Sequence, residues 1–166
     1  MPNAVEQPKH DKYERLIRAA QGQSAITVAV AHPCDDVSLH GAVEAARLRL
    51  IEPILVGPQA RIHDIAARAG LDISAMELVG SEHSQDSAAK AVELVTAGRA
   101  EALMKGSLHT DELMGAVVSR QAGIRTARRI SHCFVMDVPN HPNALIITDA
   151  AVNIAPTLDD LSLIHI

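Results

Sequence analysis

Residues 102–114 read ALMKGSLHTDELM, a short apolar run that gives way to a polar turn and then resumes at helical spacing. The apolar residues 102–104 are typical of a buried parallel strand, and Gly106 permits a sharp turn after it. Three residues can cap the helix that follows: Ser107, His109 and Thr110. The stretch therefore predicts a strand, a loop and the start of a helix, with Lys105 at the carboxyl end of the strand.

This arrangement favours an anionic ligand. In open α/β sheets ligands bind outside the carboxyl ends of the strands, and a helix N-terminus there offers free N–H groups and the positive end of its dipole. We therefore predict that Lys105 and the N–H groups of residues 106–110 bind a phosphate. The alternative is an ordinary strand-to-helix turn, since the glycine spacing of a Walker loop is missing.

Composition narrows the class of protein. The chain has 166 residues, of which 48% are apolar, so it can form one domain or the larger part of one. One Tyr, one Phe and no Trp leave no aromatic platform for stacking bases, and the net charge of −5 argues against nucleic acid as a partner. An anion must then be held by a local basic pocket. Arginines suited to bidentate phosphate contact cluster late in the chain, at Arg120, Arg125, Arg128 and Arg129.

The sequence also predicts a cytoplasmic protein. The first 24 residues are polar, and no run approaches the roughly 20 apolar residues of a membrane span. Cys34 and Cys133 lie far apart, as expected of reduced thiols rather than a disulfide framework. The histidines have no metal-ligand spacing, so we expect no metal site.

Apolar runs alternate with helical patterns along most of the chain. A short helix is expected over residues 11–20, and strands over 26–31, 54–56, 76–79 and 102–104. Of the three helices between them, the first is expected to begin at Asp36 or Ser38, the second to end at Gly70, and the third to begin at Ser84. Repeated strand-helix units predict a mostly parallel sheet covered by helices.

The pattern changes after residue 119. Two β-rich runs, at 133–138 and 144–149, are separated by a loop too short for a parallel crossover. They predict an antiparallel hairpin, either at the border of a mixed sheet or as the passage into a second subdomain.

Five blocks of the sequence together resemble the phosphate acetyltransferase and phosphate butyryltransferase family, and in particular the branch also found fused behind a MaoC-type enoyl-CoA hydratase. The likeness covers about residues 25–160. The blocks are AVAHPCD (29–35), PILVGP (53–58), MKGSLHTDEL (104–113), RISHCFVMD (129–137) and ITDAAVNIAP (147–156).

The resemblance implies a three-layer α/β/α sandwich with a mostly parallel sheet, akin to the isocitrate and isopropylmalate dehydrogenases. It implies the reaction of acetyl phosphate with coenzyme A to give acetyl-CoA and phosphate. Coenzyme A is then a substrate, and no metal or prosthetic group takes part. Two alternatives stay open: phosphate butyryltransferase, and a phosphate- or CoA-binding module without catalysis. Full-length family members are expected to be homodimers.

The same resemblance suggests substrate-binding residues. Lys105 and Arg129 are candidates for clamping phosphate, and Ser131 is a candidate neutral donor. The full set is Lys105, Gly106, Ser107, His109, Thr110, Arg129, Ser131, Asp149 and Asn153. No catalytic residue is assigned. By residue type, three histidines could act as a base: His32, His109 and His132. A histidine at a strand end is, however, more often structural. Other members have Cys where Ala150 stands, so a role for that thiol does not carry over.

The resemblance also implies that family chains run to about twice this length and carry a Ser-Arg pair and an Asp in their later half. We expect residues 1–24 to be a polar, helical extension and 25–160 to be the N-terminal part of the acyltransferase domain. Residues 161–166 are expected to be the non-native tail of a truncated gene model.

A first prediction follows from the missing block. The purified 166-residue chain is expected to show no acetyl-CoA formation from acetyl phosphate and coenzyme A, because the groups implied in thiol activation are absent. A thioester absorbance assay measures this directly, and sustained turnover would contradict it.

Overall fold

The structure is a computed structural model that describes residues 11–120, 124–126, 130–149 and 157. Its contacts divide the chain into two compact units, one of residues 23–125 and one that joins residues 1–22 to 126–166. Among the described residues, no helix has both the length and the apolar character required to cross a bilayer.

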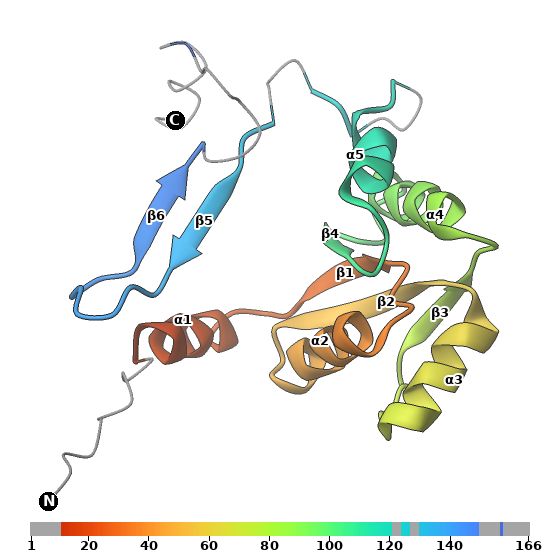
Figure 1. The fold of residues 1–166 in the computed structure, drawn as a ribbon, viewed down its shortest axis with the longest axis horizontal. Coiled ribbons are helices and arrows are strands. Elements are labelled where there is room, and N and C mark those ends of the chain that lie inside the picture. Colours follow the sequence, from red (N-terminus) through yellow and green to blue (C-terminus); the bar gives the residue numbers. More distant parts are fainter. Residues whose placement is uncertain (1–10, 121–123, 127–129, 150–156, 158–166) are drawn as a thin grey trace, which may run out of the picture. The chain divides into compact units, whose positions relative to one another are not determined.

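The larger unit contains a four-stranded parallel sheet (Figure 1). Its strands are β1 (Ile26–Ala31), β2 (Ile51–Gly57), β3 (Glu77–Gly80) and β4 (Ala102–Lys105), in the order β3-β2-β1-β4. The expected parallel sheet is confirmed. Strand β2 begins earlier than the apolar run at 54–56 indicates, because Ile51 already pairs with Ile26 of β1.

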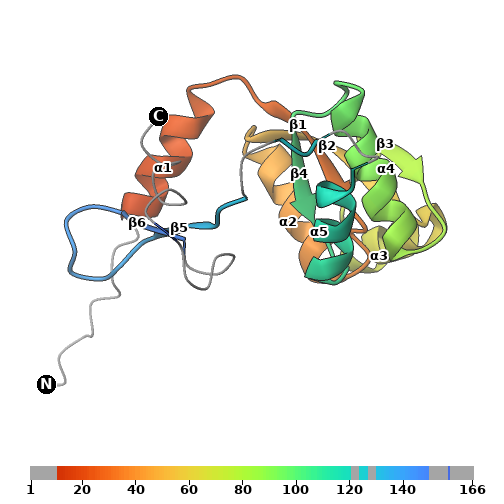
Figure 2. The ribbon, with the colours of Figure 1, turned by 90° about the horizontal axis from the view of Figure 1, so that it is seen from above.

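Helices cover both faces of this sheet. Alternation along β1 sends Val28 and Val30 to one face and Ala29 and Ala31 to the other, where they join two separate hydrophobic clusters. The first cluster includes α2 (Asp36–Arg47) and α3 (Gln59–Ala69), and the second includes α4 (Ser84–Thr96) and α5 (Thr110–Val118). Figure 2 shows β1, β2 and β4 between α2 and α4. The result is the expected three-layer α/β/α sandwich.

The helix ends differ from expectation by about one residue. Asp35, not Asp36 or Ser38, caps α2, since its Oδ1 accepts from the Ser38 N–H at 2.7 Å. His83 rather than Ser84 caps α4 through its Nδ1. Gly70 ends α3 as expected, with φ 65° in the left-handed region.

The strand order places a topological switch point beside β1. Strands β1, β2 and β3 follow one another outward with α2 and α3 on one face, and α4 then leads to β4 on the opposite side of β1. The connections therefore diverge between β1 and β4. In open α/β sheets the crevice at the carboxyl ends of such a strand pair is where ligands bind.

The smaller unit contains helix α1 (Asp11–Gln21) and the hairpin of β5 (Cys133–Met136) and β6 (Leu145–Thr148). The antiparallel pairing is confirmed, with Cys133 opposite Thr148. The expectation that the hairpin lies at the border of the main sheet is wrong, because β5 and β6 pair only with each other among the described strands. A short loop closes such a ribbon locally without a third strand. The alternative, that the hairpin is the passage into a second subdomain, stays a prediction.

Lys12 connects α1 to the hairpin loop. The residue is 8% exposed, and its Nζ donates to the carbonyl oxygens of Val138 at 2.7 Å and His141 at 2.9 Å. The same ammonium lies 2.8 Å from Oδ1 of Asp137. A buried ammonium needs such oxygen partners, so this one position holds the helix on the loop.

A second prediction tests this anchor. Lys12→Ala leaves the loop carbonyls and Asp137 without their cation and should destabilise the docking of α1 by about 3 to 5 kcal/mol. Hydrogen exchange of the α1 amides measures this loss. The matched control is Arg15→Ala on the same helix, whose side chain is exposed. Equal protection of α1 in both variants would show that Lys12 is not the anchor.

Candidate functional site

The loop after β4 lies directly against the end of β1. The Gly106 N–H donates to the Ala31 carbonyl at 2.8 Å, and the Ser107 N–H donates to the His32 carbonyl at 2.9 Å. The Ser107 hydroxyl also donates to the His32 carbonyl, at 3.0 Å. These bonds join the two loops that leave the carboxyl ends of β1 and β4, so the candidate site is built at the switch point.

Gly106 is required by this close approach. A Cβ at this position would lie 2.4 Å from the carbonyl oxygens of both Ala31 and His32. These are backbone atoms and cannot move aside as a flexible side chain can. The sequence indicated a glycine for a sharp turn, whereas the structure uses it for contact between two backbones.

The hydrogen bonds of the loop limit what it can offer a phosphate. The N–H groups of Gly106 and Ser107 donate within the fold, and the His109 N–H donates to Glu112 Oε2 at 2.9 Å. The predicted phosphate site therefore depends on Lys105 and on the remaining N–H groups of the loop. Lys105 Nζ has one weak contact, to the Gly106 carbonyl at 3.4 Å, and forms no ion pair with any described residue.

His109 and Thr110 stand where the sequence predicted, at the start of α5. Glu112, one turn on, accepts from Ser84 Oγ at 2.7 Å as well as from His109. These two bonds hold the pKa of the Glu112 carboxyl below its usual range. They also tie the N-termini of α4 and α5 together beside the switch point.

His32 is a buried polar residue of the site. It is 7% exposed, and its φ of 55° is rare for a residue other than glycine. Its Nδ1 lies 2.9 Å from Oγ of the fully buried Ser87, which in turn lies 2.7 Å from Oγ of Ser81. The sequence offered His32 as a base by residue type but did not indicate either serine, because nothing in the helix pattern of 84–96 distinguishes an inward serine.

Arg61 is a second residue that sequence reasoning missed. It lies on α3 and lines a cavity of about 460 Å³ at the same sheet edge, together with Cys34, Asp35, Asp36, Val37, Asp64, Ile65 and Arg68. Hydrogen bonds from Ser38 are the main cause that lowers the pKa of Asp35, and the charges of Lys105 and Arg61 lower it further. Burial raises the pKa of the Cys34 thiol, which makes it a poor nucleophile.

The other predicted site residues divide into two groups. Ser131 and Asp149 belong to the smaller unit, where the neighbouring His132 N–H donates to Asp149 Oδ1 at 3.1 Å. Arg129 and Asn153 lie outside the described residues. The part of the chain that the structure describes contains no group of three or more His, Cys, Asp or Glu arranged to hold a metal ion.

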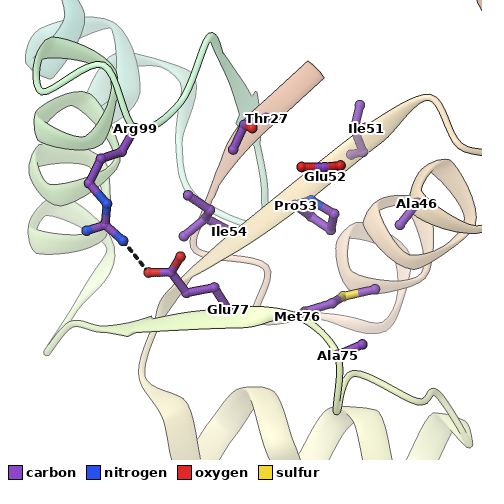
Figure 3. A pocket seen from close by; sticks show the side chains of 10 residues that line it. All are labelled: Thr27, Ala46, Ile51, Glu52, Pro53, Ile54, Ala75, Met76, Glu77 and Arg99. Atoms are coloured by element: carbon purple, nitrogen blue, oxygen red, sulfur yellow. Dashed lines mark hydrogen bonds and ion pairs between the residues drawn. The ribbon is translucent and has the colours of Figure 1, made fainter. Parts of the chain in front are cut away.

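A larger cavity, of about 580 Å³, lies at the opposite edge of the sheet (Figure 3). It is lined by residues at the starts of β1, β2 and β3, including Thr27, Glu52 and Glu77, and an ion pair joins Glu77 to Arg99. This edge holds the amino ends of the parallel strands, away from the Lys105 loop. We therefore assign the site to the carboxyl edge despite the smaller cavity there.

A protein-family model and several known proteins match this chain. Residues 81–166 match the family model described as phosphate acetyl/butaryl transferase. The chain is 57% identical over 148 residues to phosphate acetyltransferase of Rhizobium meliloti and 46% identical over 163 residues to that of Rickettsia felis. It is 36% identical over 148 residues to phosphate butyryltransferase of Clostridium beijerinckii. These matches cover 89%, 96% and 89% of this chain but 47%, 47% and 49% of the relatives, so the chain spans about half their length.

Solved structures share the fold. A phosphotransacetylase from Streptococcus pyogenes superposes with a TM-score of 0.77 at 17% identity, over 95% of this chain and 56% of that one. A phosphotransacetylase from Staphylococcus aureus gives a TM-score of 0.71 at 18% identity, over 91% and 55% of the two chains.

A third prediction tests the contact at Gly106. Gly106→Ala should lower the free energy of unfolding by about 1 to 3 kcal/mol or more, because its Cβ meets two backbone oxygens. The matched control is Gly115→Ala in the exposed part of α5, where a Cβ meets nothing within 4 Å. That change should stabilise by about 0.5 to 1 kcal/mol. Urea unfolding measures both, and equal effects of the two changes would contradict the close approach.

Proposed function

The chain belongs to the phosphate acetyl/butyryl transferase family, and on this premise we propose that it forms the N-terminal part of a phosphate acetyltransferase. The reaction is that of acetyl phosphate with coenzyme A to give acetyl-CoA and phosphate. The observation that supports this most is the family match over residues 81–166, which includes the loop at Lys105. The position of that loop at the switch point of the sheet agrees with a ligand-binding role.

Acetyl phosphate is preferred over butyryl phosphate as the substrate. The two acetyltransferases described above are 57% and 46% identical to this chain, against 36% for the butyryltransferase. Butyryl phosphate remains the second candidate, since the same family name covers both activities.

Lys105 is proposed as the cation that binds the phosphoryl group, together with Arg129. Its exposed ammonium lies at the carboxyl edge beside two helix N-termini, where negative charge is favoured. Ser131, Asp149 and Asn153 are proposed as further substrate contacts. These contacts are the ones that the family blocks at residues 104–113, 129–137 and 147–156 imply.

We also propose a cellular location and an oligomeric state. Both cysteines are free thiols, Cys34 buried and Cys133 exposed, which supports a reducing compartment such as the cytoplasm. The full-length protein is proposed to be a homodimer, with residues 25–160 as the first part of its acyltransferase domain.

A fourth prediction uses a chimera in which this chain replaces the matching segment of the Rhizobium meliloti enzyme. Lys105→Ala and Arg129→Ala should each lower kcat/KM for acetyl phosphate about tenfold to hundredfold, because each removes a charge-assisted contact of about 1.5 to 3 kcal/mol. Arg129→Lys should not restore the rate, since a point charge cannot reproduce a bidentate fork. The control is Arg47→Ala on α2, which removes an exposed ion pair with Glu44.

Parental kcat/KM in both variants would contradict the phosphate clamp. A higher kcat/KM with butyryl phosphate than with acetyl phosphate would favour the butyryltransferase alternative. A folded chimera that binds phosphate but turns over neither acyl phosphate would favour a binding module.

A further inference from the structure

An arginine in the first turn of α3 lines the cavity at the carboxyl edge of the sheet. Arg61 follows closely on the end of β2 and is exposed. Its guanidinium forms no hydrogen bond or ion pair with any residue that the structure describes. The planar fork of an arginine matches the oxygens of a phosphate group. Arg61 is therefore free to bind an anionic ligand in this cavity.

The other charged groups of the cavity already have partners. Arg68 lies 3.4 Å from Oδ2 of Asp64 and 4.0 Å from Oδ1 of Asp36. The third carboxylate, that of Asp35, accepts from the backbone N–H of Ser38 at 2.7 Å and from its hydroxyl at 2.6 Å. A carboxylate whose charge is offset in this way repels an incoming anion less than a bare one does. The cavity can therefore accept negative charge at its remaining arginine.

This cavity lies next to the loop that carries Lys105. Strand β1 stands between β2 and β4, and neighbouring strands lie about 4.8 Å apart, so the carboxyl ends of β2 and β4 are separated by about 10 Å. Asp35, just after β1, is affected by both cations: hydrogen bonds from Ser38 lower its pKa most, and the charges of Lys105 and Arg61 lower it further. Two cations that have no ion pair among the described residues thus flank the end of β1.

We propose that Arg61 binds the diphosphate of coenzyme A when Lys105 holds the phosphoryl group of the acyl phosphate. This inference rests on the function proposed above. Coenzyme A carries its thiol at one end of a flexible pantetheine arm and its diphosphate at the other, with no charged group between them. The diphosphate is therefore the first anion of coenzyme A that a second cation of this edge can meet. The extended arm is longer than the separation of the two strand ends, so the bound arm bends over the end of β1.

This contact lies away from the reacting atoms. Arg61 supplies binding for coenzyme A, and thiol activation remains with the groups that the family resemblance implies in the later half of the chain. A contact to a distant part of one substrate is made equally in the ground state and the transition state, so its loss raises KM for that substrate and leaves kcat unchanged. The KM for acetyl phosphate is then unaffected by Arg61.

Analogues of coenzyme A test the contact in the chimera described above. Arg61→Gln removes the charge and keeps a long, helix-forming side chain, so the melting temperature should stay parental. We expect kcat/KM to fall about tenfold to hundredfold for coenzyme A and for dephospho-coenzyme A, which keeps the diphosphate but lacks the 3′-phosphate. For pantetheine, which lacks the diphosphate, kcat/KM should not change. The matched control is Arg47→Gln, an exposed arginine of α2.

Three results would overturn the role of Arg61. An equal loss with pantetheine would show a structural effect instead of a phosphate contact. A loss with coenzyme A but not with dephospho-coenzyme A would identify the 3′-phosphate in place of the diphosphate. An active parent chimera whose Arg61→Gln variant keeps its KM for coenzyme A would exclude the contact. A parent chimera inactive with every acyl phosphate would instead overturn the proposed function.

Calorimetric titration of the 166-residue chain with inorganic diphosphate gives a readout that does not depend on turnover. The parent chain should bind diphosphate, Arg61→Gln should bind it at least tenfold more weakly, and Arg47→Gln should bind it as the parent does. Equal binding by the parent and Arg61→Gln, or no binding by the parent at millimolar diphosphate, would overturn the proposal whatever the activity of the chimera.

Discussion

The contact between Gly106 and the end of β1 is the constraint on which the candidate site depends. Two backbones approach so closely that no side chain fits between them, and three hydrogen bonds from Gly106 and Ser107 hold them there. This contact fixes where β4 ends and where α5 begins. Lys105 pairs with Ala31, the residue before His32, although the two lie 74 positions apart in the sequence.

Most of the fold could be predicted from the sequence, because it depends on local pattern. Short apolar runs identified all four parallel strands, and Gly70 identified a helix end through its freedom at positive φ. The hairpin followed from a loop too short for a crossover. The separate pairing of the hairpin could not be predicted, since pattern indicates that a strand exists but not which edge it joins.

The site was less predictable, because its key features are tertiary. The sequence placed Lys105 at the end of a strand and His109 and Thr110 at the start of a helix, as the structure has them, since that follows from strand-helix order. It could not indicate that three N–H groups of the loop already have acceptors inside the protein. Nor could it indicate that Ser87 turns inward to His32 or that Arg61 lies nearby, since both residues look like ordinary members of amphipathic helices.

The anchor at Lys12 has a consequence for the order in which the protein folds during synthesis. Lys12 is made before the larger unit, but its acceptor at Val138 lies 126 positions later. Residues 23–125 form a compact unit and can fold as they emerge, because domains form as units and local contacts form fastest. Lys12 of helix α1 must therefore stay in water until the hairpin loop is translated.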